Sequence, residues 1–205
     1  MPHLVLVKHS LPEVDPCRPA STWPLSVAGR RRCGPLAEAL APLRPIAIVA
    51  STEPKATETA ALVGKHLGLP ALVDARLREH DRDEEGWLEA DAFRSAIARL
   101  FERPDDRVFG LETARQAVTR FSRAVDDVLA CYRGGTGVVV AHGTVISLFC
   151  ALRASVGGYA LWGRLGLPSF VVLARPDFRL EAEVAKIPDL EGSGDDPSGG
   201  REGAP

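Results

Sequence analysis

Residues 3–10 read HLVLVKHS, a nearly continuous apolar run followed at once by a lysine, a histidine and a serine. Three further apolar runs, rich in Val, Ile and Ala, occur at residues 46–50, 137–141 and 170–173. Short apolar runs without polar alternation are typical of strands that are buried on both faces, as in a parallel sheet. The chain is therefore predicted to contain a central sheet whose strands are mostly parallel.

Helical patterns separate these apolar runs. Ser26 is a good N-cap for a helix that extends to about Leu43, and Gly68 is a good C-cap for a helix over residues 54–67. Residues 91–101 and 113–132 have helical patterns as well. Strands that alternate with helices predict an α/β three-layer sandwich, with a mostly parallel central sheet and helices on both faces.

The chain length suits a single domain. Its 205 residues lie close to the size of one domain, and we expect residues 1–187 to form it. Residues 188–205 contain almost no large apolar side chain. Such a segment buries too little apolar surface to offset the entropy of ordering, so we predict that it is a disordered C-terminal tail.

Composition excludes several classes of protein. The apolar runs are far shorter than the ~18 residues of a membrane span, and a formal net charge of −2 gives no basic field for nucleic acid. We expect no signal peptide, because the chain start lacks a basic segment before a long apolar stretch. The four cysteines form no C-x-x-C pair and are predicted to be reduced thiols. We therefore expect a cytoplasmic protein; its oligomeric state stays open.

Polar residues with phosphate chemistry follow three of the predicted strands. The first strand leads into Lys8-His9-Ser10, the second into residues 51–55, STEPK, and the strand at residues 137–141 into His142-Gly143-Thr144. Ligands of open α/β sheets bind at the carboxyl ends of the strands. A phosphoryl group requires positive donors around its oxygens, a nucleophile and an acid for the leaving group, so these residues predict a phosphate site.

Six short segments match motifs that occur together in one family. Lys8-His9-Ser10 corresponds to an Arg-His-Gly signature, and residues 51–60, STEPKATETA, to a Ser-Ser-x-x-x-Arg-Ala-x-x-Thr-Ala segment. The others are LSVAG at 25–29, LRE at 77–79, GLET at 110–113 and VAHGTVI at 140–146. Over about residues 3–185 the chain thus resembles the histidine phosphatase superfamily, which includes the cofactor-dependent phosphoglycerate mutases and many phosphomonoesterases. The resemblance implies a phosphoglycerate mutase-like fold.

The resemblance also implies roles for single residues. His9 stands where the family has its phosphorylated nucleophile, and His142 where a second histidine binds the transferring phosphoryl group. Glu79 stands where the family has its proton donor, a role that requires a raised pKa. Its neighbours His80, Asp81, Asp83, Glu84 and Glu85 remain alternatives. The candidate phosphate-binding residues are Lys8, Lys55, Ser10, Ser21 and Thr22.

Three positions depart from the family pattern. Lys8 and Lys55 stand where the family has arginines, which keeps the charge but loses the planar fork that holds two phosphate oxygens. Ser10 replaces a glycine, so its side chain is expected either to crowd the pocket or to donate a hydrogen bond. Arg18, on the loop after His9, is a candidate for the missing guanidinium. These departures are the reason why a module with weakened catalysis is kept as an alternative below.

The function implied is that of a phosphomonoesterase, a histidine acid-type phosphatase. It would hydrolyse a small phosphorylated substrate through a phosphohistidine on His9, with no metal and no cofactor. A phosphoglycerate mutase is an alternative, although residues 11–16, LPEVDP, lack the run that follows the histidine in the mutases. The other alternative is a phosphoester-binding module with weakened catalysis.

Overall fold

A six-stranded sheet forms the centre of the molecule in the computed structural model, which describes residues 2–187. The strand order is β3-β2-β4-β1-β5-β6, and the first four strands in this order are parallel while β5 and β6 are antiparallel to their neighbours. The strands are β1 (His3–Lys8), β2 (Pro45–Ala50), β3 (Ala71–Val73), β4 (Thr136–Ala141), β5 (Ser169–Ala174) and β6 (Leu180–Val184). The prediction of a mostly parallel sheet is confirmed.

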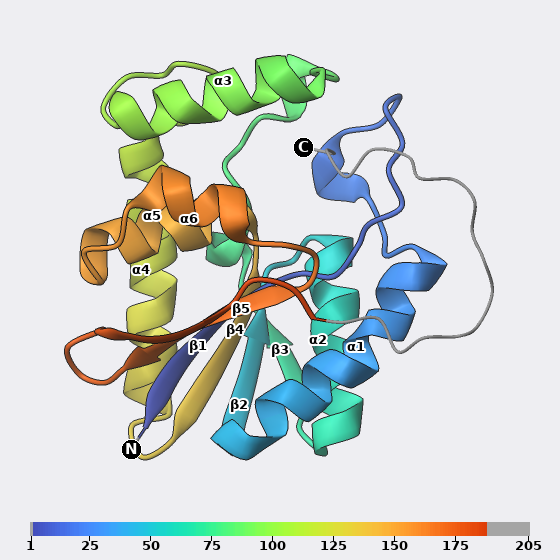
Figure 1. Cartoon of the computed structure of the whole chain (residues 1–205), viewed down its shortest axis with the longest axis vertical. Helices are drawn as coiled ribbons and strands as arrows, with labels where there is room; N and C mark the ends of the chain where they lie inside the picture. Colours follow the sequence, from blue (N-terminus) through green and yellow to red (C-terminus); the bar gives the residue numbers. More distant parts are fainter. Residues whose placement is uncertain (1, 188–205) are drawn as a thin grey trace.

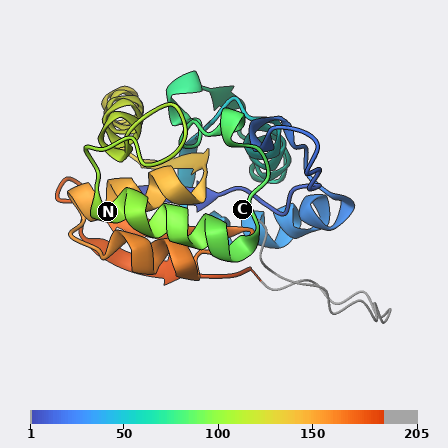
Figure 2. The same cartoon turned by 90° about the horizontal axis from the view of Figure 1, so that it is seen from above.

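Helices cover both faces of the sheet, as predicted for a three-layer sandwich (Figures 1 and 2). The α-helices are α1 (Val27–Leu40), α2 (Pro54–Leu67), α3 (Ala90–Glu102), α4 (Ala114–Cys131), α5 (Gly143–Arg153) and α6 (Gly158–Arg164). Two separate cores result, because successive side chains of a strand point to opposite faces. Leu4 and Leu6 of β1 pack in the core beneath α3 to α6, whereas Val5 and Val7 pack beneath α1 and α2.

The local signals in the sequence set the helix ends. The hydroxyl of Ser26 accepts a hydrogen bond from the Gly29 amide at the start of α1, which ends at Leu40 and continues as a 3₁₀ turn over Ala41–Leu43. Gly68 ends α2 in the left-handed conformation, with φ of 68°. A capping box of Thr113 and Gln116 starts α4. These ends confirm the predicted helices to within three residues.

Four elements were not expected from the sequence. The strands β3 and β6 lie at the two edges of the sheet, and their short, partly exposed sequences lack the apolar runs of the inner strands. In α5 the residues 143–150 are all buried, so no polar face reveals a helical period. The fourth element, α6, is only seven residues long and packs against α3 and α5.

The topology brings the carboxyl ends of β1, β2 and β4 together in the middle of the molecule, below α3 in Figure 1. The loop from residue 10 to 26 and the segment from residue 74 to 89 lie around this point. Cys33 and Cys150 are buried free thiols, and Cys17 and Cys131 are exposed ones. No helix within residues 2–187 is long and apolar enough to span a membrane. The predicted tail, residues 188–205, lies outside the described residues.

Candidate functional site

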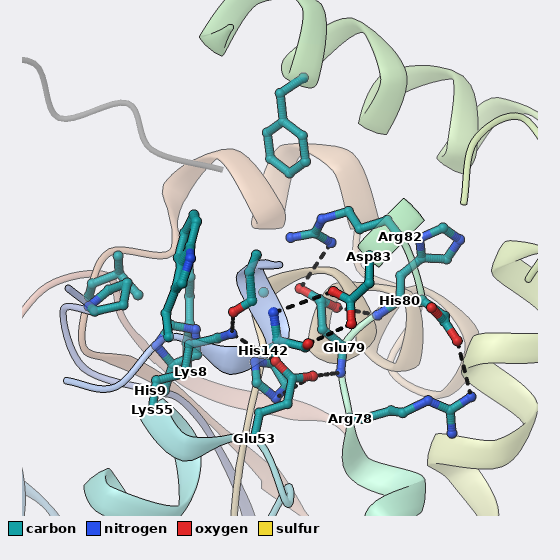
Figure 3. A pocket seen from close by; sticks show the side chains of 18 of the residues that line it. Lys8, His9, Glu53, Lys55, Arg78, Glu79, His80, Arg82, Asp83 and His142 are labelled. Atoms are coloured by element: carbon teal, nitrogen blue, oxygen red, sulfur yellow. Dashed lines mark hydrogen bonds and ion pairs between the residues drawn. The ribbon is translucent and has the colours of Figure 1, made fainter. Parts of the chain in front are cut away.

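A cavity of about 140 Å³ opens at the carboxyl ends of β1, β2 and β4 (Figure 3). Its lining includes Lys8, His9, Lys55, Glu79 and His142, five residues that the sequence assigns to the phosphate site. They come from four separate segments of the chain, so only the folded sheet brings them together.

His9 directly follows β1, and its amide donates a hydrogen bond to the carbonyl of Ala141 at the end of the parallel neighbour β4. The ring is buried, and Nδ1 donates to the carbonyl of Ser10 at 2.7 Å, which leaves the lone pair on Nε2. Burial, followed by the electrostatic effects of His142 and Lys55, holds the pKa of His9 well below its ordinary value. The ring is therefore neutral near pH 7, as a nitrogen nucleophile must be.

His142 lies at the N-cap of α5, where β4 ends, and its ring centroid is 5.1 Å from that of His9. Nε2 lies 2.8 Å from the hydroxyl of Ser51 and 3.4 Å from a carboxylate oxygen of Glu53. Burial is the main reason that the pKa of His142 also lies well below its ordinary value, and Lys55 adds to the effect. Its Nδ1 has no hydrogen-bond partner within residues 2–187.

The two lysines enter the cavity from β1 and α2. Lys8 Nζ donates to the carbonyl of Leu165 at 2.8 Å. Burial lowers the pKa of Lys8 to about 8, although Glu79 partly offsets this effect. Lys55 Nζ lies 2.7 Å from the carboxylate of Glu53 and also donates to the carbonyl of Ala20. Both ammonium groups thus reach the cavity as charges with fixed positions.

Glu53 is a part of this site to which no sequence motif points. It is the N-cap residue of α2, and its side chain turns inward, where one oxygen pairs with Lys55 and the other accepts the Glu79 amide at 2.7 Å. The carboxylate is buried among the cations that would hold a phosphate. A negative group at this position competes with a phosphoryl group for Lys55.

Glu79 lies between the cavity and the N-terminus of α5. Its carboxylate accepts hydrogen bonds from the amides of His80, Thr144 and Val145, and the side chain is 11% exposed. Burial alone would raise the pKa of Glu79, but the charge of Arg82, followed by His142 and the backbone amides, lowers it below its ordinary value. Glu79 is therefore ionised near pH 7 when no substrate is bound, although a proton donor requires a raised pKa.

A buried ion pair holds the backbone around Glu79 in place. Arg120 of α4 pairs with Glu112 and donates to the carbonyls of Arg76, Arg78 and Glu79. Glu112 accepts the amide of Asp81 in turn. The GLET segment, in which Glu112 precedes the N-cap Thr113, was the only part of this ion pair that the sequence indicated. Its partner, Arg120, is identified only by the fold.

Two arginines contribute to the lining of the cavity, and neither is Arg18. Arg78 and Arg82 line it, whereas Arg18 lines a neighbouring cavity. Figure 3 shows Arg82 above Glu79, and the two groups are 3.8 Å apart. The sequence positions these arginines on the same acidic loop as Glu79, but nothing in it indicates which of them turns inward.

Three predicted phosphate ligands are placed differently from expectation. The hydroxyl of Ser10 donates to the carbonyl of Gly29 at 2.7 Å, so it points away from the cavity and neither crowds it nor donates into it. The hydroxyl of Thr22 donates to the carbonyl of Pro19, and Thr22 does not line the cavity. Ser21 does line it, but its hydroxyl donates to Asp83. Ser10 and Thr22 therefore lie outside the group of residues that the cavity brings together.

The arrangement suits transfer of a phosphoryl group. A neutral imidazole nitrogen, a second buried imidazole, two ammonium groups and a carboxyl group border one small cavity, which is the set of groups that such a transfer needs. Within residues 2–187, no group of three or more His, Cys, Asp or Glu side chains is arranged to hold a metal ion.

Comparison with known proteins identifies one family that the chain matches over most of its length. The family model described as the histidine phosphatase superfamily (branch 1) matches residues 10–171. A curated relative, glucosyl-3-phosphoglycerate phosphatase of Mycolicibacterium vanbaalenii, is 35% identical over an alignment of 164 positions, and the match covers 73% of this chain and 72% of the relative.

Solved structures share the fold. A native structure of mycobacterial glucosyl-3-phosphoglycerate phosphatase has a TM-score of 0.71 and 28% identity, and the match covers 90% of this chain and 98% of that one. A phosphoglycerate mutase from Bacillus anthracis has a TM-score of 0.67 at 19% identity, covering 91% of this chain and 93% of the mutase. At that identity the likeness concerns the fold alone, and it confirms the predicted phosphoglycerate mutase-like sandwich.

Proposed function

This chain belongs to the histidine phosphatase superfamily, and we propose that it hydrolyses a small phosphomonoester through a phosphohistidine on His9. The observation that carries the proposal is the state of His9: a neutral ring whose Nδ1 is occupied by the Ser10 carbonyl and whose Nε2 retains its lone pair beside His142 and the two lysines.

In the first step, Nε2 of His9 attacks phosphorus while the bond to the leaving oxygen breaks. The carboxyl group of Glu79 gives its proton to that oxygen, so the products are an alcohol, a phosphohistidine and the Glu79 carboxylate. Lys8, Lys55 and the His142 imidazole stabilise the charge on the phosphoryl oxygens. Fixed donors of this kind stabilise the transition state because they need no reorientation as the charge moves.

In the second step, water attacks phosphorus and Glu79 takes its proton. The bond between phosphorus and Nε2 breaks, which releases orthophosphate and restores both His9 and the Glu79 carboxyl group. For this role Glu79 must bind a proton while substrate is present. A phosphoryl dianion beside the carboxylate disfavours its negative charge and therefore raises its pKa.

The relatives support a phosphatase whose cavity takes a phosphate-like anion. The mycobacterial glucosyl-3-phosphoglycerate phosphatase has been solved in complex with VO3 and with inorganic phosphate. For this chain we propose a small phosphorylated molecule as substrate, released as an alcohol and orthophosphate.

One observation favours a second candidate function, a phosphoester-binding module with weak catalysis. The carboxylate of Glu53 forms an ion pair with Lys55 at 2.7 Å, and this pairing reduces the positive charge available to a phosphoryl group. Such a module would bind phosphate esters without appreciable turnover.

The test is a phosphoenzyme trap. The chain is incubated with a ³²P-labelled phosphate ester and quenched in base, and the label is located by peptide mapping. We expect an acid-labile, base-stable label on His9, orthophosphate release with multiple turnovers, and a rate that EDTA does not change. Binding of the ester without label or turnover would support the module instead. Loss of activity on chelation, restored by a divalent ion, would contradict the proposed mechanism.

We expect the activity of the free enzyme to fall at alkaline pH because Lys8 loses its charge. Its pKa is lowered from 10.5 to about 8, so kcat/KM should decrease as pH rises through about 8. The same shift makes the unfolded chain bind more protons than the folded chain between these pH values. The contribution of Lys8 to the free energy of unfolding therefore rises in this window, and unfolding through this group cannot explain the loss.

The measurement is the pH profile of kcat/KM for the native chain and for Lys8→Arg, whose charge persists at all these pH values. We expect the alkaline limb to be absent in Lys8→Arg, even if its maximum rate is lower. An identical limb in both proteins would show that another group causes it.

A further inference from the structure

A second cavity, of about 180 Å³, adjoins the first on the side away from the strand ends. Its lining comes from the loop that follows β1, from the segment before α3, and from α3 itself. The two cavities share Ala20, Trp23, Arg82, Asp83 and Phe93. The histidines and both lysines of the proposed phosphate site line only the first cavity, so the second offers space without the groups that transfer the phosphoryl group.

Arg82 lies at the junction and has few partners for a largely enclosed charge. Its side chain is only 14% exposed, and the guanidinium lies 4.9 Å from the centre of the Phe93 ring. The nearest carboxylate oxygen, on Glu79, is 3.8 Å away, too far for a hydrogen bond. Its buried Nη1 has no hydrogen-bond partner within residues 2–187. A charged donor in this state is costly unless a ligand supplies an acceptor.

The carboxylates near the junction already have donors. Asp83 accepts the hydroxyl of Ser21, and Glu85 accepts the amide of Gly110. A second guanidinium, that of Arg18, lines the outer cavity, whose wall also includes the Trp23 and Trp87 rings with centroids 6.2 Å apart. The group that lacks a partner at this junction is therefore the Arg82 guanidinium, and the partner that it needs is an anion.

The geometry of phosphoryl transfer sets the direction in which a substrate extends. The attacking and leaving atoms lie on opposite sides of phosphorus. If His9 attacks and Glu79 protonates the leaving oxygen, the rest of the leaving group continues past Glu79, where Arg82 and then the second cavity lie. Figure 3 shows the Arg82 guanidinium directed toward the middle of the cavity.

We propose that the second cavity holds the leaving group of the substrate and that Arg82 binds an anionic group, a carboxylate or a second phosphate, carried by that leaving group. The inference rests on the proposed function, and it narrows the substrate to phosphomonoesters with a second negative group. Binding of that group would draw Arg82 away from Glu79. Since Arg82 is the main charge that keeps the pKa of Glu79 low, this movement favours the protonated acid.

The test compares two esters that differ in one group. 3-Phosphoglycerate has a carboxylate where glycerol 3-phosphate has a hydroxymethyl group. The readout is the ratio of their kcat/KM values, because an effect on folding or on phosphoryl transfer acts on both esters and cancels in the ratio. We expect the native chain to prefer the carboxylate, and Arg82→Gln to lower the ratio by roughly 10- to 100-fold, the range for one charge-assisted hydrogen bond.

Arg123→Gln is the matched control. It removes one arginine from an exposed position of α4 that lines neither cavity, so the ratio should not change. Arg82→Lys retains the charge and should keep most of the preference. A native ratio near one, or an equal loss for both esters in Arg82→Gln, would overturn the proposal.

Calorimetry with His9→Ala separates this proposal from the proposed function. That variant lacks the nucleophile, so binding of the two esters can be measured without turnover. Tighter binding of 3-phosphoglycerate that disappears in His9→Ala/Arg82→Gln would support the Arg82 site even if the native chain has no phosphatase activity. Equal binding of both esters would refute it even if the native chain is an active phosphatase.

Discussion

Replacing His9 with alanine is expected to abolish turnover, with a fall in kcat of roughly 10⁴-fold or more, the scale for loss of a covalent nucleophile. The physical reason is that Nε2 of His9 is the group that forms the bond to phosphorus, and the remaining residues can only bind and polarise the ester. The measurement is hydrolysis of a chromogenic phosphate ester, together with the phosphoenzyme label.

His66→Ala provides the control for this variant. His66 lies exposed near the end of α2, where Nδ1 donates to the carbonyl of Leu62, and it lines neither cavity. We expect native turnover and native labelling from it. Because the His9 ring is buried, the melting temperature of His9→Ala is measured as well. If folded His9→Ala still became labelled or kept more than about one per cent of native turnover, another residue would be the nucleophile.

Replacing Lys55 with methionine is expected to lower kcat by roughly 10²- to 10³-fold, the scale for one preorganised donor in a transition state. The same change leaves the buried Glu53 carboxylate without its cation, which destabilises the fold. A loss of turnover in Lys55→Met alone could therefore come from the missing phosphate donor or from the lower stability of the fold. Lys65→Met, at an exposed position of the same helix, is the control and should change neither turnover nor stability.

The pair Glu53→Gln and Lys55→Met separates the effects. In the double variant no unpaired carboxylate remains, so the melting temperature lost in Lys55→Met should be largely regained. Turnover should stay low, because the donor to the phosphoryl group is still missing. If turnover instead returned with stability, Lys55 would serve only to neutralise Glu53, and the phosphate would have to lie elsewhere in the cavity.

Glu53→Gln by itself addresses the competition between the carboxylate and a phosphate. With Lys55 free of its ion pair, the cavity gains net positive charge, and inorganic phosphate should inhibit at lower concentration than in the native chain. Glu53→Gln should thus strengthen the binding of the anion, whereas Lys55→Met should weaken its stabilisation. Opposite effects of this kind are expected if both residues act on the same anion.

Most of the fold was evident from the sequence because its signals are local. The apolar runs that became β1, β2, β4 and β5 are buried on both faces, and such runs need no information from distant residues to be recognised. Caps such as Ser26, Gly68 and Thr113 act within one helical turn. The edge strands and α5 lack a local signal, because their exposure or burial is set by their neighbours in space.

For residues that directly follow a strand, the sequence by itself also determined that they meet at the site. The carboxyl ends of neighbouring parallel strands share one edge of the sheet, so His9, Lys55 and His142 had to come together. Lys8, at the end of the first strand, was predicted with them on the same ground, and Glu79 joined them on the family resemblance.

Only the tertiary structure decided where side chains point and what they pair with. Ser10 turns to Gly29, Glu53 turns inward to Lys55, and Arg82 lines the first cavity whereas Arg18 lines only the second. Arg120 reaches the backbone of the Glu79 loop across more than 40 residues of sequence. These choices depend on packing, on charge balance and on free space between segments that are distant in the chain, and those quantities exist only once the chain has folded.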